Sequence, residues 1–246
     1  MDSVSLNQHL SQIQTLWTLV QQAHADTPDE VRAAQQRLLE RYGGAVRRYL
    51  LGALRDEDAA AECFQEFAYR LVHGDMRGAD PGRGRFRHFV KGVLFHLVAD
   101  HHRKRQRLPY QQHSDTPEPA AEPSTADQDR EFLASWRDEI LARSWVALER
   151  DEKESGKPLY TVLRFKVDHA DLPSARLAEE LGAKLGKQLT AAGVRQTVHR
   201  ARERFADLLL DEVVQSLDSP NAERLEGELI DLGLLEYCRP ALERRS

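Results

Sequence analysis

The sequence predicts an all-α protein with two helical domains joined by an acidic, proline-containing linker. Apolar residues recur at steps of three and four along most of the 246-residue chain, and no convincing alternating strand pattern stands out. Residues 111–129 interrupt this periodicity with three prolines, five acids and no basic residue, a composition that favours an extended chain. The predicted layout is an N-terminal helical extension (1–27), a first domain (28–108), the linker (109–130), a second domain (131–217) and a C-terminal tail (218–246).

The first domain is predicted to contain three helices. The stretch DTPDEV marks a helix start near residue 28 through its cap residue, its proline in the first turn and its early acids. Gly43 and Gly44 inside that helix are costly in isolation, so tertiary packing must hold this part. A second helix is expected over about residues 58–72. After a loop rich in glycine, a third helix carries one continuous apolar face of Phe86, Phe89, Val90, Val93, Leu94, Leu97 and Val98.

The second domain is also predicted to be helical. Helices resume at about Glu131 and break at ESGKP (154–158). A short capped helix in DLPSARLAEELG is expected to end at Gly182, and a long helix is expected over residues 190–217. The connection between these two, residues 183–193, is long for a turn. The N-terminal extension and the tail are expected to pack on the domains, with a regulatory contact as a second option.

The amino-acid composition is that of a globular protein rather than a membrane-spanning or disordered one. Apolar residues make up 41% of the chain and charged residues 30%, values typical of a globular protein in water. No run approaches the roughly 18 apolar residues of a membrane span, and the first residues lack a basic region followed by an apolar core. Cys63 and Cys238 lie far apart, which suits a reducing compartment. We therefore expect a cytoplasmic protein with no membrane contact, no metal and no cofactor.

Charge is distributed unevenly along the chain. Residues 83–107 hold eight Arg or Lys and one acid, Asp100, so this stretch carries +7 while the whole chain carries −5. The rest of the chain therefore carries −12. A block of one sign can be plain solvated surface. A basic stripe beside aromatic residues on an otherwise acidic protein more often marks contact with a polyanion.

The long helix of the second domain carries side chains suited to DNA recognition. Its apolar stripe consists of Val194, Val198, Ala201, Phe205 and Leu208. The polar residues Arg195, Gln196, His199, Arg200 and Arg202 lie off that stripe, in the first turns of the helix. Major-groove readout needs bidentate donors, Arg to guanine or Gln to adenine, near the start of the second helix of a helix-turn-helix. An ordinary amphipathic surface helix would look similar.

The sequence resembles the extracytoplasmic-function (ECF) sigma factors of bacterial RNA polymerase. VRQTVHRARERFADLL (194–209) is similar to the end of region 4, ECFQEFAYRLV (62–72) to region 2.2, and FVKGVLFHLVADHHRKR (89–105) to regions 2.3 and 2.4. Two sets of motifs in the family's order, across a linker, cover roughly residues 29–217. The resemblance implies a region 2-like helical bundle and a region 4-like helix-turn-helix. It also implies no enzymatic activity of the chain's own.

The resemblance assigns promoter contacts to both domains. It implies that the first domain opens the −10 element and holds one melted strand, through Arg83, Arg85, Phe86, His88, Phe89, His96, Arg103, Lys104 and Arg105. Such binding uses a cationic groove and aromatic faces. The family's asparagine beside the flipped base is His96 here, which should alter the −10 preference. The −35 element would be contacted by Arg195, Gln196, His199, Arg200 and Arg202.

The same resemblance implies partners other than DNA. Glu62, Gln65, Glu66 and Tyr69 match positions with which the family docks on the β′ clamp of core polymerase. The family's acidic cluster before them is reduced to Glu62, since positions 59–61 are alanines. Weaker binding of core polymerase, or help from another segment, would follow. An anti-sigma factor or another regulator is a further partner that the family allows.

Two other functions remain open at this stage. A DNA-binding regulator or polymerase-associated protein without initiation activity would have the same two domains. A metal-dependent enzyme could use His96, Asp100, His101 and His102, because a His and an Asp four residues apart share a helix face. No second cluster of His, Glu or Cys offers further ligands, and basic residues nearby disfavour a bound cation.

Overall fold

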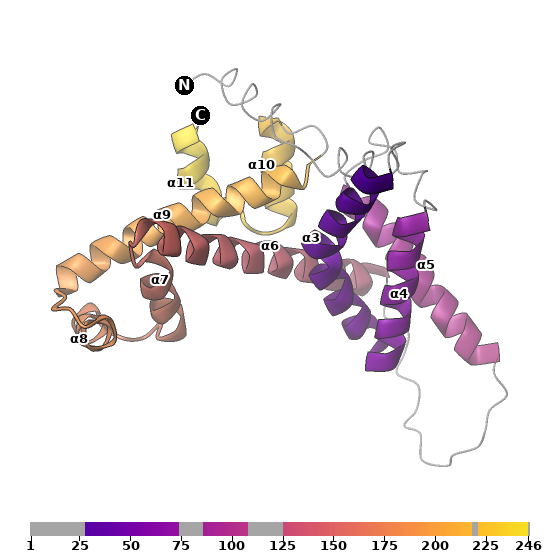
Figure 1. Cartoon of the computed structure of the whole chain (residues 1–246), viewed down its shortest axis with the longest axis horizontal. Helices are drawn as coiled ribbons and strands as arrows, with labels where there is room; N and C mark the ends of the chain where they lie inside the picture. The colour runs from indigo at the N-terminus through magenta and orange to yellow at the C-terminus, as the bar shows by residue number, and fades with distance from the viewer. Residues whose placement is uncertain (1–27, 74–85, 108–124, 218–220, 246) are drawn as a thin grey trace, which may run out of the picture. The chain divides into compact units, whose positions relative to one another are not determined.

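The computed structural model describes residues 28–73, 86–107, 125–217 and 221–245, and these residues form nine α-helices and no strand (Figure 1). The predicted all-α class is confirmed for this part of the chain. The predicted N-terminal helix, Arg83, Arg85 and most of the predicted linker lie outside the described residues. No helix in the described ranges is long and apolar enough to cross a membrane.

The chain divides into two compact units. Of the described residues, the N-terminal unit contains 28–73, 86–107, 125–139 and 215–217, and the C-terminal unit contains 140–214 and 221–245. The division falls inside a helix, after Glu139, whereas the sequence pattern suggested a change of domain within residues 109–130.

Three helices begin the N-terminal unit: α3 (Pro28–Leu54), α4 (Glu57–His73) and α5 (Phe86–Arg107). Helix α4 agrees with the helix expected over about residues 58–72, α3 starts at the proline that marked it, and α5 begins at Phe86, the first residue of its predicted apolar face. Arg55 stands between α3 and α4 in the left-handed region, at φ 53°. Asp56 then caps α4, because its Oδ1 accepts from the Ala59 backbone N–H at 3.0 Å. That hydrogen bond lowers the pKa of the Asp56 carboxyl.

Only the second glycine of the α3 pair is explained by a close neighbour. A Cβ on Gly44 would collide with the carboxylate of Glu139, whereas a Cβ on Gly43 would make an ordinary van der Waals contact with the Phe64 ring at 3.5 Å. Gly44 therefore lets the Glu139 side chain lie against α3.

The first part of α6 (Thr125–Ser155) completes the core of the N-terminal unit. Trp136 stacks on Tyr42 with ring centroids 4.7 Å apart, and Phe132 meets Tyr49 edge-on at 5.6 Å. Trp136 and Phe132 are 1% and 2% exposed. The helix begins at Thr125 rather than near Glu131, so residues 125–130 are helical and not part of a linker. The aromatic pair explains the difference, because helix before Phe132 is needed to present it to the core.

The C-terminal unit is built from the rest of α6 with α7 (Leu159–Asp168), α8 (Ser174–Leu185) and α9 (Ala191–Gln215). One core cluster joins Val162 of α7, Leu177 and Leu181 of α8, and Val194 and Val198 of α9. A second cluster joins Leu148 of α6 to the middle of α9 through Ala201, Phe205 and Leu208. The stripe predicted for α9 is therefore buried along its length.

Helix α8 ends one turn later than expected. The helix passes through Gly182 and stops at Leu185, and Gly186 adopts φ 63°. The backbone N–H groups of Gly186 and Lys187 both donate to the Gly182 carbonyl oxygen, a Schellman-type end. The turn to α9 is therefore residues 186–190, shorter than the connection suggested by the sequence.

The tail forms a helical hairpin of α10 (Ala222–Asp231) and α11 (Leu235–Arg245) within the C-terminal unit. Asn221 caps α10 by accepting from the Arg224 backbone N–H at 2.8 Å. Leu225, Leu229, Leu232 and Cys238 are buried. The expectation that the tail packs on a domain is confirmed.

Candidate nucleic-acid interface

The start of α9 is fixed by a cap and by the shared core. The Thr190 hydroxyl accepts from the Gly193 backbone N–H at 3.0 Å, which satisfies one of the free donors of the first turn. Val194 and Val198 are buried against α7 and α8. The predicted readers lie off this buried stripe and are all exposed: Arg195, Gln196, His199, Arg200 and Arg202.

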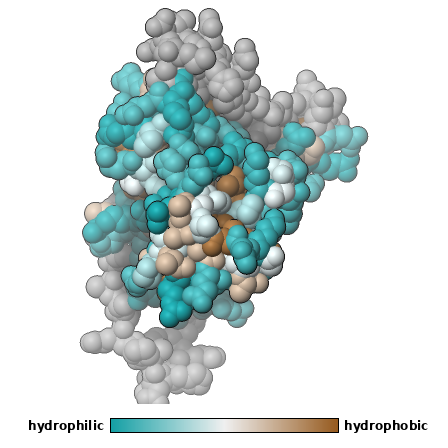
Figure 2. All heavy atoms as spheres, turned by 90° about the vertical axis from the view of Figure 1, so that its left-hand side faces the viewer, coloured by the Kyte–Doolittle hydropathy of each residue, from teal (hydrophilic) through white to brown (hydrophobic). Residues whose placement is uncertain are grey.

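These outward residues form two groups. Arg195, His199 and Arg202 line a hollow of about 220 Å³ beside Lys166 of α7 and Ser174 of α8, with Leu177, Val194 and Val198 as its apolar floor. Figure 2 shows a face of the molecule on which a small group of hydrophobic atoms is surrounded by hydrophilic atoms. Gln196 and Arg200 are not part of the hollow. The helix thus presents a cationic edge and a separate polar edge.

Lys166 was not among the DNA-binding residues predicted from the sequence, and its ammonium group contacts backbone carbonyl oxygens nearby. Its Nζ donates to the carbonyl oxygens of Ala170 and Leu172, at 3.3 Å for the latter, where α7 turns into α8. Cations stabilise a helix C-terminus in this way. We therefore assign Lys166 to holding the turn.

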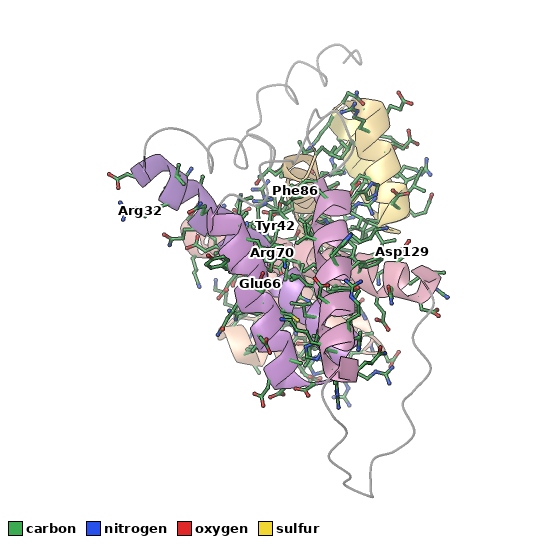
Figure 3. All side chains as sticks on the ribbon, turned by 90° about the vertical axis from the view of Figure 1, so that its right-hand side faces the viewer. Arg32, Tyr42, Glu66, Arg70, Phe86 and Asp129 are labelled. Carbon is green, nitrogen blue, oxygen red and sulfur yellow. The ribbon has the colours of Figure 1, made fainter. Side chains whose placement is uncertain are left out.

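In the N-terminal unit, α4 and α5 enclose an open hollow of about 560 Å³. Phe89, Gly92, Val93, His96 and Asp100 line it from α5, and Glu66 and Arg70 line it from α4. A residue assigned to polymerase contact, Glu66, therefore lies beside His96, which was assigned to reading a base. Glu66 and Arg70 lie one turn apart on α4 and form an ion pair at 2.7 Å (Figure 3). Their four-residue spacing was the sequence signal for this pair.

His96 is exposed and has a defined hydrogen bond. Its Nδ1 lies 2.7 Å from the Gly92 carbonyl oxygen. Because a carbonyl only accepts, Nδ1 carries the proton in this hydrogen bond, so Nε2 is the nitrogen that can accept in that tautomer. His88 is exposed as well.

The aromatic residues at the start of α5 differ in exposure. Phe86 is 4% exposed and packs on Tyr42 and Trp136 at centroid distances of 5.6 and 6.5 Å. In this arrangement its ring belongs to the core and is not presented to a ligand. Phe89 is half-buried, and part of it reaches the hollow. Arg87, not assigned to DNA, is buried.

The basic tip of α5 is solvent-exposed. Arg103, Lys104 and Arg105 are all exposed, and Arg103 forms an ion pair with Asp100. The hydrogen bond from Arg103 lowers the pKa of the Asp100 carboxyl. Asp100 thus holds one guanidinium in place at the edge of the hollow.

The predicted polymerase-docking residues share one exposed face of α4. Glu62, Gln65, Glu66 and Tyr69 are all exposed, and Tyr69 is the most apolar of them at 54% exposed. An exposed aromatic side chain among carboxylates suits a protein contact.

A metal site finds no support in the described ranges. No group of three or more His, Cys, Asp or Glu side chains there is arranged to hold a metal ion. His101 and His102 stand at 76° with ring centroids 6.0 Å apart, and Asp100 is taken by Arg103.

Comparisons with families of known proteins, with curated proteins and with solved structures find no match to this chain.

Proposed function

We propose that the chain is a sigma factor of the ECF type, which binds core RNA polymerase, recognises −35 and −10 promoter elements and promotes DNA melting. The observation that carries the proposal is the start of α9. A capped helix follows a short turn after α8, shares its core, and exposes five polar or cationic side chains. These features support a helix-turn-helix, whose second helix would enter the major groove.

The residues of α9 divide between two tasks in this proposal. Arg195, Gln196 and His199, in its first turns, read base edges of the −35 element. Arg200 and Arg202, further along, contact phosphates and set the register of the helix.

The exposed surface of α5 supports the −10 assignment. Arg103, Lys104 and Arg105 act on phosphates of the melted strand. The hollow between α4 and α5, lined by His96 and Phe89 among others, would receive an unstacked base of that strand. The exposed face of α4 around Tyr69 docks on the β′ clamp.

The test is transcription by core polymerase with and without the protein. Promoter-sized fragments from a random genomic library are transcribed, and the transcripts are mapped. We expect starts that depend on this protein and share two sequence elements. Arg195→Ala should abolish most of them, because one reader of the −35 element is lost. Arg150→Ala removes the same charge from an exposed position on α6 and should leave them unchanged.

Two results would contradict the proposal. Transcription that never depends on the protein, together with Arg195-dependent binding of duplex DNA, would make it a DNA-binding regulator without initiation activity. If neither protein-dependent transcription nor Arg195-dependent DNA binding is observed, the protein does not act on DNA.

A further inference from the structure

We propose that the hairpin α10–α11 strengthens DNA binding by neutralising an acidic ridge on α9. The ridge consists of Glu203, Asp207 and Asp211, and the neutralising groups are Arg244 and Arg245 in the last turn of α11. The inference rests on the proposed function, since it requires that α9 faces DNA. It gives the tail, which lies outside the resemblance to sigma factors, a defined role.

The acidic ridge continues the DNA-facing side of α9. Its members are four residues apart, so they share one helix face, and Glu203 lies one turn beyond His199. At 1.5 Å per residue, Asp207 is only about 10 Å along the axis from Arg200. That distance is close to one Debye length at physiological salt, roughly 8 Å. Free carboxylates there would repel the phosphates that border the groove.

Every acid of the ridge has an arginine of α11 beside it. Arg244 lies 3.0 Å from an oxygen of Asp207 and 3.6 Å from one of Glu203. Arg245 lies 2.7 Å from Asp211 and also donates to the backbone carbonyl oxygen of Asp207 at 2.9 Å. The ridge of three negative charges is reduced to one.

Packing of the hairpin sets this position. The Tyr237 ring meets Phe205 of α9 edge-on at 6.1 Å, and Cys238 and Ala241 are fully buried behind it. Gly233, at φ 67°, permits the tight turn between α10 and α11. Arg244 and Arg245 are therefore held beside the ridge by the packing of α11 against α9.

The same contacts protect a predicted reader. His199 Nε2 lies 3.7 Å from Glu203, so the imidazole and Arg244 compete for one carboxylate. Loss of Arg244 would leave His199 as the other ion-pair partner of that carboxylate.

The experiment compares full-length variants on one duplex. The parent protein first enriches a sequence from a pool of random duplexes, and the best sequence is labelled and titrated by fluorescence anisotropy over a series of KCl concentrations. Arg244→Gln with Arg245→Gln should weaken binding about tenfold at low salt, because screening is weakest there. Adding Asp207→Asn and Asp211→Asn should restore affinity to within about threefold of the parent, because the repulsion is removed by another route. Arg150→Gln with Arg239→Gln removes the same charge away from the ridge and should change affinity less than the Arg244/Arg245 pair does.

If the two arginines only held the hairpin in place, the DNA affinities of the variants would differ from this expectation. The variant with all four substitutions would then bind no better than the variant with the two arginine substitutions, since the ion pairs stay broken. Folding of the hairpin is followed through the Cys238 thiol in a Cys63→Ala background. Burial raises the pKa of Cys238 to about 12, and the thiol should stay unreactive to a disulfide reagent while the hairpin is packed.

Three outcomes overturn the inference. Unchanged affinity in the two-arginine variant is one, and a loss that the asparagines do not restore is another. The third is that the parent protein does not bind duplex DNA, or that Arg195→Ala does not weaken its binding. That outcome would also contradict the DNA-binding part of the proposed function. The first two leave the proposed function standing.

Discussion

Gly182 shows how a residue can be noticed in the sequence for the wrong reason. A glycine after a short helical pattern predicted a helix end there, yet α8 continues to Leu185. A Cβ at position 182 would lie 2.8 Å from the Lys187 backbone carbonyl oxygen. The glycine is required because the chain folds back over it, and this depends on the turn rather than on the local pattern.

Gly182→Ala should therefore destabilise the C-terminal unit by about 1–3 kcal/mol, since the backbone itself must shift. Urea unfolding measures the loss, and faster hydrogen exchange in α8 and α9 would localise it. Gly52→Ala is the matched control. No atom lies within 4 Å of a Cβ there, so this exposed helical position should gain about 0.5–1 kcal/mol. Equal effects of the two substitutions would contradict the role given to the turn.

His96 carries the residue-scale prediction for the −10 element. His96→Asn replaces a ring acceptor, Nε2, by a side-chain amide with a different geometry. We expect it to change which −10 variants are opened, by about 1–3 kcal/mol at one base, while −35 binding stays the same. Permanganate reactivity of unpaired thymines, with core polymerase present, measures opening across a set of variants. An unchanged order of variants would make His96 a helix residue without a base contact.

At the scale of elements, the periodicity of apolar residues predicted most helices. It failed where tertiary packing determines where a helix begins or which side chain is buried. The bounds of α4 and α9, the start of α3 and the apolar face of α5 follow from their sequence patterns. The beginning of α6 does not, because residues 125–130 have a linker's composition and become helical in front of Phe132 and Trp136. Phe86 shows the same limit within the candidate site: its place beside basic residues suggested a DNA contact, and its burial comes from Trp136, distant in sequence.

The exposed face of α4 yields an element-scale prediction. Glu66→Lys should weaken binding of core polymerase by at least tenfold, because reversed charge in a complementary interface costs more than a lost contact. Fluorescence titration with labelled core polymerase gives the affinity. Glu66→Gln separates loss of charge from the new repulsion with Arg70. Glu40→Lys, an exposed position on α3, controls for net charge, and an equal loss there would remove the docking face from α4.

At the scale of the whole molecule, the division after Glu139 changes what a cut in the acidic stretch should do. A flexible tether between domains would release two separate fragments. In the structure the N-terminal unit includes the first part of α6, which lies after that stretch in the chain. The contacts that hold it are the Tyr42–Trp136 stack, an ion pair of Arg48 with Glu139 at 2.6 Å and one of Lys91 with Asp129 at 3.0 Å.

We therefore predict that glutamyl endopeptidase cuts first at Glu118 or Glu122, within the predicted linker, and that the two fragments then elute together in gel filtration. The two ion pairs lie at partly exposed positions, where solvent and salt screen them, so they should add little. Burial of Trp136 and Phe132 should carry most of the association, since truncating a buried aromatic residue costs about 3–5 kcal/mol. Trp136→Ala should accordingly let the cut fragments separate, whereas Trp145→Ala, in the C-terminal unit, should not. Separation of the parent's fragments without denaturant would mean that the first part of α6 is not a stable part of the N-terminal unit, and that the two domains are joined by a free tether.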